Sequence, residues 1–292
     1  MLSVIVINFR MEDLTVRFVS EELSKIKIPY KTVIVNNAAN DESNAALCSS
    51  LSAELVCDDS ECDLSRDCFV LSSGENLGFA KGNNLGAEFS RRFDPEFILF
   101  ANNDIVFQDE DVVERLMEKL AAVQDAGVIG PRVVGIDGAL QSPHPFRSFW
   151  DKEVWMYWSS LFWSKEKKIK EFSLDYSEKA SEGFHYYVMG SFLLVRAEDF
   201  YACGMFDPHT FLYAEEPILS ERMAAVGKGV YYLPSVTVIH AHGATTATLP
   251  NGKRRDWQFE SNMYYYRTYC HTGPFLLMLG RLTHALMKCR KR

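Results

Sequence analysis

The chain has 292 residues, of which 47% are hydrophobic and 24% are charged, and its formal net charge is −8. These values are typical of a globular protein with one large domain and an appendage, or with two small domains. The acidic balance excludes a general nucleic-acid binder, so no nucleic-acid partner is expected.

Strand and helix patterns alternate through the first half of the chain. Residues 3–9 form a compact β-type run, and residues 12–26 place apolar side chains on one helical face. Further strands are predicted over residues 31–37, 68–73, 96–104 and 127–134, and further helices over residues 41–55 (from an acidic cap), 83–93 and 109–126. This alternation predicts an α/β fold with a mostly parallel central sheet and helices on both faces.

The second half of the chain is less regular. Residues 144–176 are rich in aromatic side chains and lysine, which is interpreted as an insertion that covers the site or faces a partner or a membrane. Packing of these aromatic side chains in a second small core is an equally good interpretation. A strand and the start of a helix are predicted over residues 186–200, a short helix over 215–227, and a late strand or hairpin over 228–243.

Polar residues cluster at or just after the predicted strand ends. Four clusters are residues 36–41, 75–84, 102–104 and 240–243, and a fifth places Glu215 and Glu216 at the start of a helix. The carboxyl ends of parallel strands meet at one edge of a sheet, so the clusters are expected to line one crevice.

The residue types in this crevice fit a divalent metal. Asp104 is a hard oxygen ligand suited to Mg²⁺ or Mn²⁺, and one carboxylate suffices when a diphosphate supplies other oxygens. His240 or His242 would add a nitrogen ligand and favour Mn²⁺. An Asx turn at Asp104 and a structural role for the histidine are the alternatives.

Several segments together resemble family 2 glycosyltransferases, in the rhamnosyltransferase-like branch of bacterial polysaccharide assembly that includes O-antigen synthesis. They are, in the family's order, "SVIVINFR", "VIVNNAAND", "ENLGFAKGNN", "FILFANND", "GSFLLVRAEDFYACGMFDPHTFLYAEEPIL" and "VIHAHG". The resemblance covers residues 1–245 and implies a GT-A glycosyltransferase domain there. It also implies a nucleotide-diphosphate sugar donor, a Mn²⁺ or Mg²⁺ cofactor, and inversion at the anomeric carbon. The remaining residues, 246–292, are expected from their composition to form a helical, basic, membrane-associating segment.

The resemblance assigns roles to three acidic residues. Asp104 matches the last Asp of the family's D-x-D-type motif, which bridges the metal to the donor diphosphate, and His240 is the second expected metal ligand. Glu216 aligns with the acid of the family's "ED" motif, the expected general base. Glu215 is the neighbouring catalytic candidate, although a carboxylate at a helix N-terminus is favourable by itself.

The resemblance also implies a set of donor-binding residues. Asn36 stands where the family usually has Asp, so contact with a uracil or thymine base would use its amide oxygen. The other expected donor contacts are Asn8, Phe9, Asp41, Asn76, Gly78, Lys81 and Asn102.

Two departures keep a second interpretation open. Relatives tend to have Asp where Ile218 stands, and Pro217 is unusual there. Together with Asn36, they allow a catalytically degenerate, sugar-nucleotide-binding subunit. A nucleotidyltransferase is a weaker alternative, because residues 7–14 offer Arg10 but no glycine for a triphosphate loop.

The C-terminal residues 273–292 form a short apolar run, broken by Arg281 and followed by positive charge. No stretch of the chain has the roughly 18 apolar residues that a membrane span needs. The pattern favours an interfacial helix on an inner-leaflet surface or a terminal helix packed on the domain.

The expected acceptor is a saccharide or a polyprenyl-linked saccharide. Seven cysteines and a strand-like N-terminus favour reduced thiols and a cytoplasmic setting, with peripheral membrane association.

Overall fold

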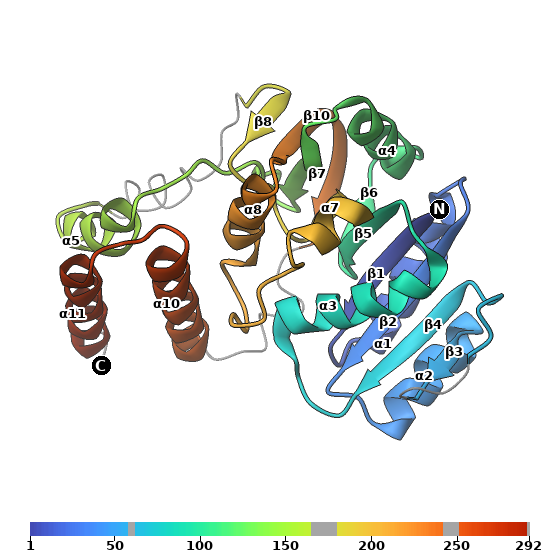
Figure 1. Ribbon diagram of the computed structural model, residues 1–292. Coiled ribbons are helices and arrows are strands. Elements are labelled where there is room, and N and C mark those ends of the chain that lie inside the picture. The colour runs from blue at the N-terminus through green and yellow to red at the C-terminus, as the bar shows by residue number, and fades with distance from the viewer. Residues whose placement is uncertain (58–61, 165–179, 242–250, 291–292) are drawn as a thin grey trace.

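A computed structural model describes residues 1–57, 62–164, 180–241 and 251–290 of the chain. Its described strands form one mixed sheet in the order β3-β4-β2-β1-β5-β9-β7-β10-β6, with β8 paired to β10 (Figure 1). The strands are β1 (Leu2–Asn8), β2 (Tyr30–Asn37), β3 (Glu54–Val56), β4 (Cys68–Ser73), β5 (Phe97–Asn102), β6 (Ile105–Phe107), β7 (Ala126–Gly135), β8 (Gly183–His185), β9 (Phe192–Arg196) and β10 (Gly229–His240).

The pairing directions bring the polar strand ends to one edge. Strands β3, β4, β2, β1 and β5 run parallel, and β9 is antiparallel to both β5 and β7. Strand β7 therefore runs in the direction of β5, and β10 runs parallel to β7. The end of β10 consequently meets the end of β5, where the start of β9 also lies.

Helices cover both faces of the sheet, as the alternation predicts. The helices of the sheet unit are α1 (Glu12–Arg17), α2 (Asp41–Leu51), α3 (Gly78–Ser90), α4 (Val112–Ala122), α7 (Ala197–Ala202) and α8 (Glu215–Ala225). Strand β5 shows why two layers are needed: Leu99 packs in a core with Leu116 of α4, whereas Phe100 packs on the other face with Phe200 of α7. Side chains that alternate along a strand point to opposite faces, so both faces are apolar.

Several helix limits differ from the sequence-based predictions, and the helix predicted over residues 41–55 ends at Leu51, with strand β3 following it. The helix predicted over residues 12–26 is α1 followed by a π turn, η1 (Phe18–Glu22), and a 3₁₀ turn, η2 (Leu23–Lys25). Helix α3 begins at Gly78, five residues before the predicted start. Helix α2 is capped by the amide of Asn40, which accepts a hydrogen bond from the Ser43 backbone at 2.7 Å, and the acidic residues occupy its first turn.

The C-terminal helices α10 (Asn251–Thr268) and α11 (Pro274–Arg290) pack together with η4 (Trp150–Trp155) and α5 (Met156–Ser160), at the end of the molecule away from β3 and α2 (Figure 1). Phe149, Ile218, Phe259 and Tyr266 belong to a small core that joins this group to α8. Trp150, Trp155 and Trp158 are about half exposed, so the aromatic insertion contributes both to a second core and to the surface. None of the described helices is long and apolar enough to span a membrane.

Candidate active site

A cavity of about 400 Å³ opens at the sheet edge where β5, β9 and β10 meet. Asn102 ends β5 and Asp104 follows it, His240 ends β10, and Glu215 and Glu216 begin α8. All five residues line this cavity. The sheet therefore brings three of the predicted polar clusters into one crevice. The cluster of residues 36–41 instead contributes Ala38 and Asn40 to a separate cavity.

Asp104 and His240 form the best-defined pair in the cavity. Their side chains are almost fully buried, and the Asp104 Oδ1 atom lies 3.3 Å from the His240 Nε2 atom. The pairing of β6 with β10 fixes this arrangement, because Ile105 lies opposite His240 and the Ala241 backbone donates to the Asp104 carbonyl oxygen at 2.9 Å. The contact therefore follows from strand register.

The hydrogen bond on the other side of the imidazole orients the ring for a metal. The His240 Nδ1 atom lies 2.8 Å from the Gln141 Oε1 atom, which can only accept, so Nδ1 carries the proton. In the neutral ring, Nε2 then presents a lone pair on the side of Asp104. A carboxylate oxygen and an imidazole nitrogen facing one another are a suitable donor set for Mn²⁺ or Mg²⁺.

Unpaired buried oxygens in the cavity also indicate a ligand. The Asp104 Oδ1, Ser191 Oγ and Glu215 Oε1 atoms are buried without a hydrogen-bond partner among the described residues. Buried polar atoms are nearly always paired, so three such atoms in one cavity mark a place that a polar ligand completes. No group of three or more metal-ligating side chains occurs within the described ranges, and His242 lies outside them. The pair Asp104–His240 fits a cation whose other ligands come from substrate oxygens.

The two glutamates at the start of α8 have perturbed acidities. Burial raises the pKa of Glu215 well above its usual value, and the neighbouring Glu216 charge raises it further. Burial likewise raises the pKa of Glu216, although its carboxylate accepts from the Gly190 backbone at 3.0 Å and lies near the positive Lys152. Carboxylates with raised pKa values in a cavity are candidates for proton transfer.

Asn8 and Asn36 form a buried amide network at the ends of β1 and β2. The Asn8 Nδ2 atom donates to the Asn36 Oδ1 atom at 2.8 Å, and the Asn36 Nδ2 atom donates to Asn44 Oδ1 at 2.8 Å. Thr15 donates to the Asn8 Oδ1 atom, and Asn36 is 1% exposed. Both amides are thus largely engaged within the protein, and a base contact by Asn36 stays a prediction.

A second cavity of about 460 Å³ lies at the same sheet edge, where β1 and β2 end. Arg10, Asp13, Ala38, Asn40 and Glu42 line it, and Asp41 is exposed between two of them in the first turn of α2. Phe9 is half-buried next to it, with the Arg10 guanidinium 5.4 Å from its ring. This is the part of the structure in which the sequence predicts nucleoside contacts.

The predicted donor loop has a visible structural role. The Asn76 Oδ1 atom accepts from Asn37 Nδ2 at 3.1 Å and from the Gly78 backbone at 3.0 Å. Gly78 has φ of +74°, and a Cβ there would lie 2.2 Å from the Phe211 carbonyl oxygen. Lys81 is exposed on α3. The loop thus holds the start of α3 against the segment that leads to Glu215.

Sequence reasoning missed the cationic and aromatic residues of the cavity. Lys152 from η4, Arg254 from α10, and His144 stacked on Tyr187 with ring centroids 4.5 Å apart all line it. The Arg254 Nε atom donates to the Tyr213 hydroxyl at 3.4 Å. None of these residues follows a strand of the parallel region, so no strand-end signal could have found them.

The protein has the GT-A fold, which it shares with two solved glycosyltransferases. A mannosyltransferase from Pyrobaculum calidifontis, solved in complex with GDP-Man and Mn²⁺, superposes with a TM-score of 0.58 at 12% identity, over 99% of this chain and 75% of that chain. The structure of GalNAc-T7 with UDP, GalNAc and Mn²⁺ gives a TM-score of 0.56 at 14% identity, over 91% of this chain and 49% of that chain. At these identities the similarity shows the fold alone.

The sequence match is narrower than the fold match and identifies the family. The profile of glycosyl transferase family 2 matches residues 3–187, so the chain belongs to that family. It is 26% identical over 194 residues to an N-acetylglucosaminyl-diphospho-decaprenol L-rhamnosyltransferase of Mycobacterium tuberculosis, covering 62% of this chain and 61% of that protein. It is 28% identical over 200 residues to the rhamnosyltransferase WbbL of Escherichia coli K12, covering 66% of this chain and 71% of that protein. The matched region spans about three fifths of the length of the mycobacterial relative.

Proposed function

We propose that this protein is an inverting, metal-dependent glycosyltransferase. It transfers a sugar, rhamnose by analogy with its curated relatives, from a UDP- or dTDP-sugar to a saccharide acceptor in cell-surface polysaccharide synthesis. The single observation that carries the proposal is the Asp104–His240 pair, which shares a cavity with Glu215 and Glu216 in a family 2 chain.

On the donor side, Asp104 Oδ1 and His240 Nε2 would hold the divalent cation, and Asn102 lines the same cavity. When bound, the cation neutralises charge on the leaving diphosphate. Lys152 and Arg254 add fixed positive charge to a cavity that otherwise carries three carboxylates, which favours an anionic substrate there. The donor nucleoside is assigned to the cavity at the ends of β1 and β2, near Phe9 and Asp41.

On the acceptor side, Glu216 is the general base. Its carboxylate takes the proton of the acceptor hydroxyl as that oxygen attacks the anomeric carbon on the face opposite the leaving group. The new bond joins acceptor oxygen to anomeric carbon, and the bond between that carbon and the diphosphate oxygen breaks with its electron pair. The configuration inverts, and the Gly190 backbone hydrogen bond holds the Glu216 carboxylate in place.

We assign a lipid-linked acceptor on two grounds. The mycobacterial relative is named for a diphospho-decaprenol acceptor, and helix α11 leaves an apolar face uncovered. Phe275, Leu282 and Leu286 are exposed on that face, with the exposed Arg281 and Lys288 on the same helix. An apolar face with flanking positive charge suits the surface of an anionic membrane.

Calorimetric binding of UDP, dTDP and GDP, each with and without Mn²⁺, tests the donor site. We expect one pyrimidine nucleoside diphosphate to bind only with metal, and Asp104→Asn to weaken that binding at least tenfold. That loss corresponds to about 1.4 kcal/mol. Asp125→Asn changes an exposed carboxylate beside the start of β10, at the opposite end of that strand from His240. It is the matched control and should bind as wild type does.

Two results would change the proposal. If nucleotide binding is the same with and without Mn²⁺, and is unchanged in Asp104→Asn, the proposed metal site is wrong. Metal-dependent binding without measurable transfer to any saccharide acceptor would select the alternative of a sugar-nucleotide-binding subunit, which the family membership does not favour.

A further inference from the structure

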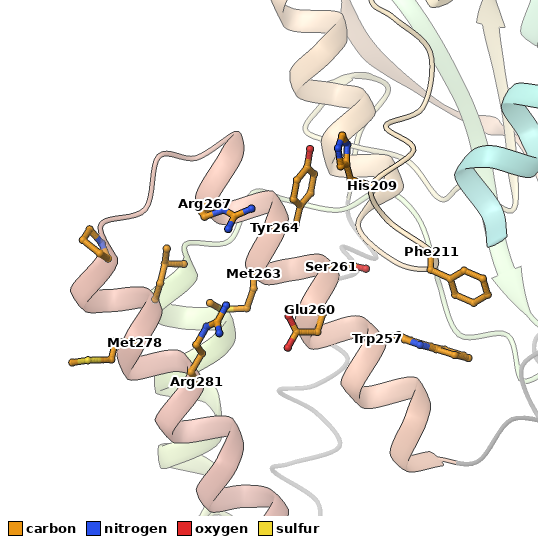
Figure 2. Close-up of a pocket in the computed structure, with 12 residues that line it drawn as sticks. His209, Phe211, Trp257, Glu260, Ser261, Met263, Tyr264, Arg267, Met278 and Arg281 are labelled. Carbon is orange, nitrogen blue, oxygen red and sulfur yellow. The ribbon is translucent and has the colours of Figure 1, made fainter. Parts of the chain in front are cut away.

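A groove of about 550 Å³ lies outside the catalytic cavity, between α10, α11 and the segment around His209 and Phe211 (Figure 2). The two cavities have no lining residue in common. Helix α10 separates them: Arg254, Gln258 and Asn262 face the catalytic cavity, whereas other positions of the same helix face the groove. No role assigned so far uses this groove.

Two guanidinium groups give the groove its charge. Arg267 projects from α10 and Arg281 from α11, and Figure 2 shows both side chains in the space between these helices. Neither forms a salt bridge with a residue in the described part of the chain, and Arg267 lies 6.0 Å from the Tyr264 ring. Glu260 is the carboxylate among the lining residues, so the lining keeps an excess of positive charge.

The rest of the lining is mainly apolar. Met263, Leu277 and Met278 contribute thioether and aliphatic surface between the two helices. Met278 is also half-exposed, so the groove continues into the uncovered apolar face of α11 that begins at Phe275. A ligand in this groove would therefore meet positive charge and a continuous apolar surface together.

The other end of the groove adjoins the catalytic cavity. Trp257 and Phe211, with ring centroids 4.9 Å apart, line the groove, while their chain neighbours Gln258 and Leu212 line the cavity. The Ser261 hydroxyl of α10 donates to the Leu212 carbonyl oxygen at 2.9 Å and ties the two walls together. Arg267 follows Trp257 by ten positions, which is about 15 Å along a helix.

We propose that this groove binds the isoprenoid diphosphate part of a lipid-linked acceptor. Arg267 and Arg281 hold the diphosphate, the isoprenoid chain lies on Met278 and the apolar face of α11, and the saccharide extends past Trp257 toward Glu216. Paired guanidinium groups match phosphate oxygens in geometry and charge. The assignment rests on the proposed function, because it names the acceptor class of the same enzyme.

Geranylgeranyl diphosphate is a suitable probe of the full chain, titrated by calorimetry without metal. We expect it to bind wild type and to bind the double variant Arg267→Gln/Arg281→Gln at least tenfold more weakly. Met278→Gln should weaken the binding of geranylgeranyl diphosphate but leave the binding of inorganic diphosphate unchanged. Arg17→Gln/Arg66→Gln removes two exposed arginines elsewhere and should bind as wild type does.

Further measurements distinguish binding of the diphosphate from binding of the isoprenoid chain, and distinguish the groove from the catalytic cavity and from a membrane surface. Geranylgeraniol, which lacks the diphosphate, should bind at least tenfold more weakly. Equal binding of geranylgeranyl diphosphate to wild type and the double arginine variant would overturn the proposal. Loss of probe binding in Asp104→Asn would also overturn it. Loss of phosphatidylglycerol vesicle binding in Arg267→Gln would do the same, because Arg267 lies on α10 and has no part in the proposed membrane contact of α11.

The nucleotide-binding experiment and the experiment on the groove can fail independently of each other. If no nucleoside diphosphate binds with Mn²⁺ but the probe still binds through Arg267 and Arg281, the proposed function is wrong and the groove remains a lipid-diphosphate site. If nucleotide binding is as proposed but the probe binds wild type and the double arginine variant equally well, only the assignment of the acceptor groove is wrong.

Discussion

At the scale of single residues, the acid pair Glu215–Glu216 determines how the site can transfer a proton. A general base must be ionised to accept a proton, and burial makes ionisation harder for both side chains. The raised pKa of Glu216 makes its carboxylate a stronger base than an exposed glutamate. It also means that activity is lost as pH falls through a value above the usual 4.5.

We therefore expect Glu216→Gln to lower kcat by about 100- to 10,000-fold, the usual contribution of a general base. The KM for the donor should change little, because the proposed donor contacts lie at Asp104, at His240 and in the separate cavity at the ends of β1 and β2. In wild type, the acid limb of the kcat/KM profile should lie above pH 4.5. Steady-state rates from pH 4 to 8 check both expectations.

Glu198→Gln, on an exposed face of α7, is the control and should leave the rate unchanged. Glu215→Gln makes the same carboxylate-to-amide change at the neighbouring residue and so compares the two candidates for the general base. A larger rate loss in Glu215→Gln than in Glu216→Gln would identify Glu215 as the general base. Wild-type rates in both variants would show that neither glutamate is the general base.

At the scale of elements, the start of α3 is held against the segment that carries the site. The Phe79 backbone donates to the Phe211 carbonyl oxygen at 3.0 Å, and the neighbouring Gly78 allows this approach because it has no Cβ. The segment after Phe211 leads directly to Glu215 and Glu216. Disturbing this contact should affect stability and the site together.

Gly78→Ala should lower the free energy of unfolding by more than the about 1–2 kcal/mol that a left-handed conformation alone costs a residue with a Cβ. Gly138→Ala is the matched control, because Gly138 has φ of +77° but nothing within 4 Å of an added Cβ. Urea unfolding of both variants separates backbone strain from the clash with Phe211. Equal losses in the two variants would show that the close approach contributes nothing.

At the scale of the whole molecule, an acidic protein carries a basic, apolar helix at one end. The net charge is −8, yet α11 exposes Phe275, Leu282 and Leu286 together with Arg281 and Lys288. The helical group of α5, α10 and α11 stands at the far end of the molecule from β3 and α2 (Figure 1). Docking through α11 would leave the nucleoside end of the sheet away from the membrane.

Phe275→Glu/Leu282→Glu should reduce sedimentation with phosphatidylglycerol vesicles at least tenfold, because it places two carboxylates on the apolar face. Ile136→Glu, at a residue that is 77% exposed elsewhere, is the control and should sediment as wild type does. Added salt should weaken wild-type binding, since part of it is electrostatic. If the double variant sediments with the vesicles as wild type does, this face of α11 does not bind the membrane.

The sequence predicted the sheet and most strand positions because the periodicity of buried strands is local. Strands β1, β2, β4, β5 and β7 lie within a few residues of their predicted limits. The polar ends at Asn102, Asp104 and His240 could be assigned to one edge by the general rule for parallel strands. The boundary predicted at residue 245 lies outside the described residues, so the domain division stays a prediction.

The sequence by itself thus determined the α/β class and the edge of the sheet where the polar strand ends gather, because both depend on local pattern. The resemblance to the family then named Asp104 and Glu216 as the principal candidates. Only the tertiary structure decided that Lys152 and Arg254 join the cavity, that Asn36 is engaged by Asn8 and Asn44, and that Arg267 and Arg281 share a groove. These contacts join helices and loops far apart in the chain. Their packing depends on shape and burial across the whole fold, which no local spacing records.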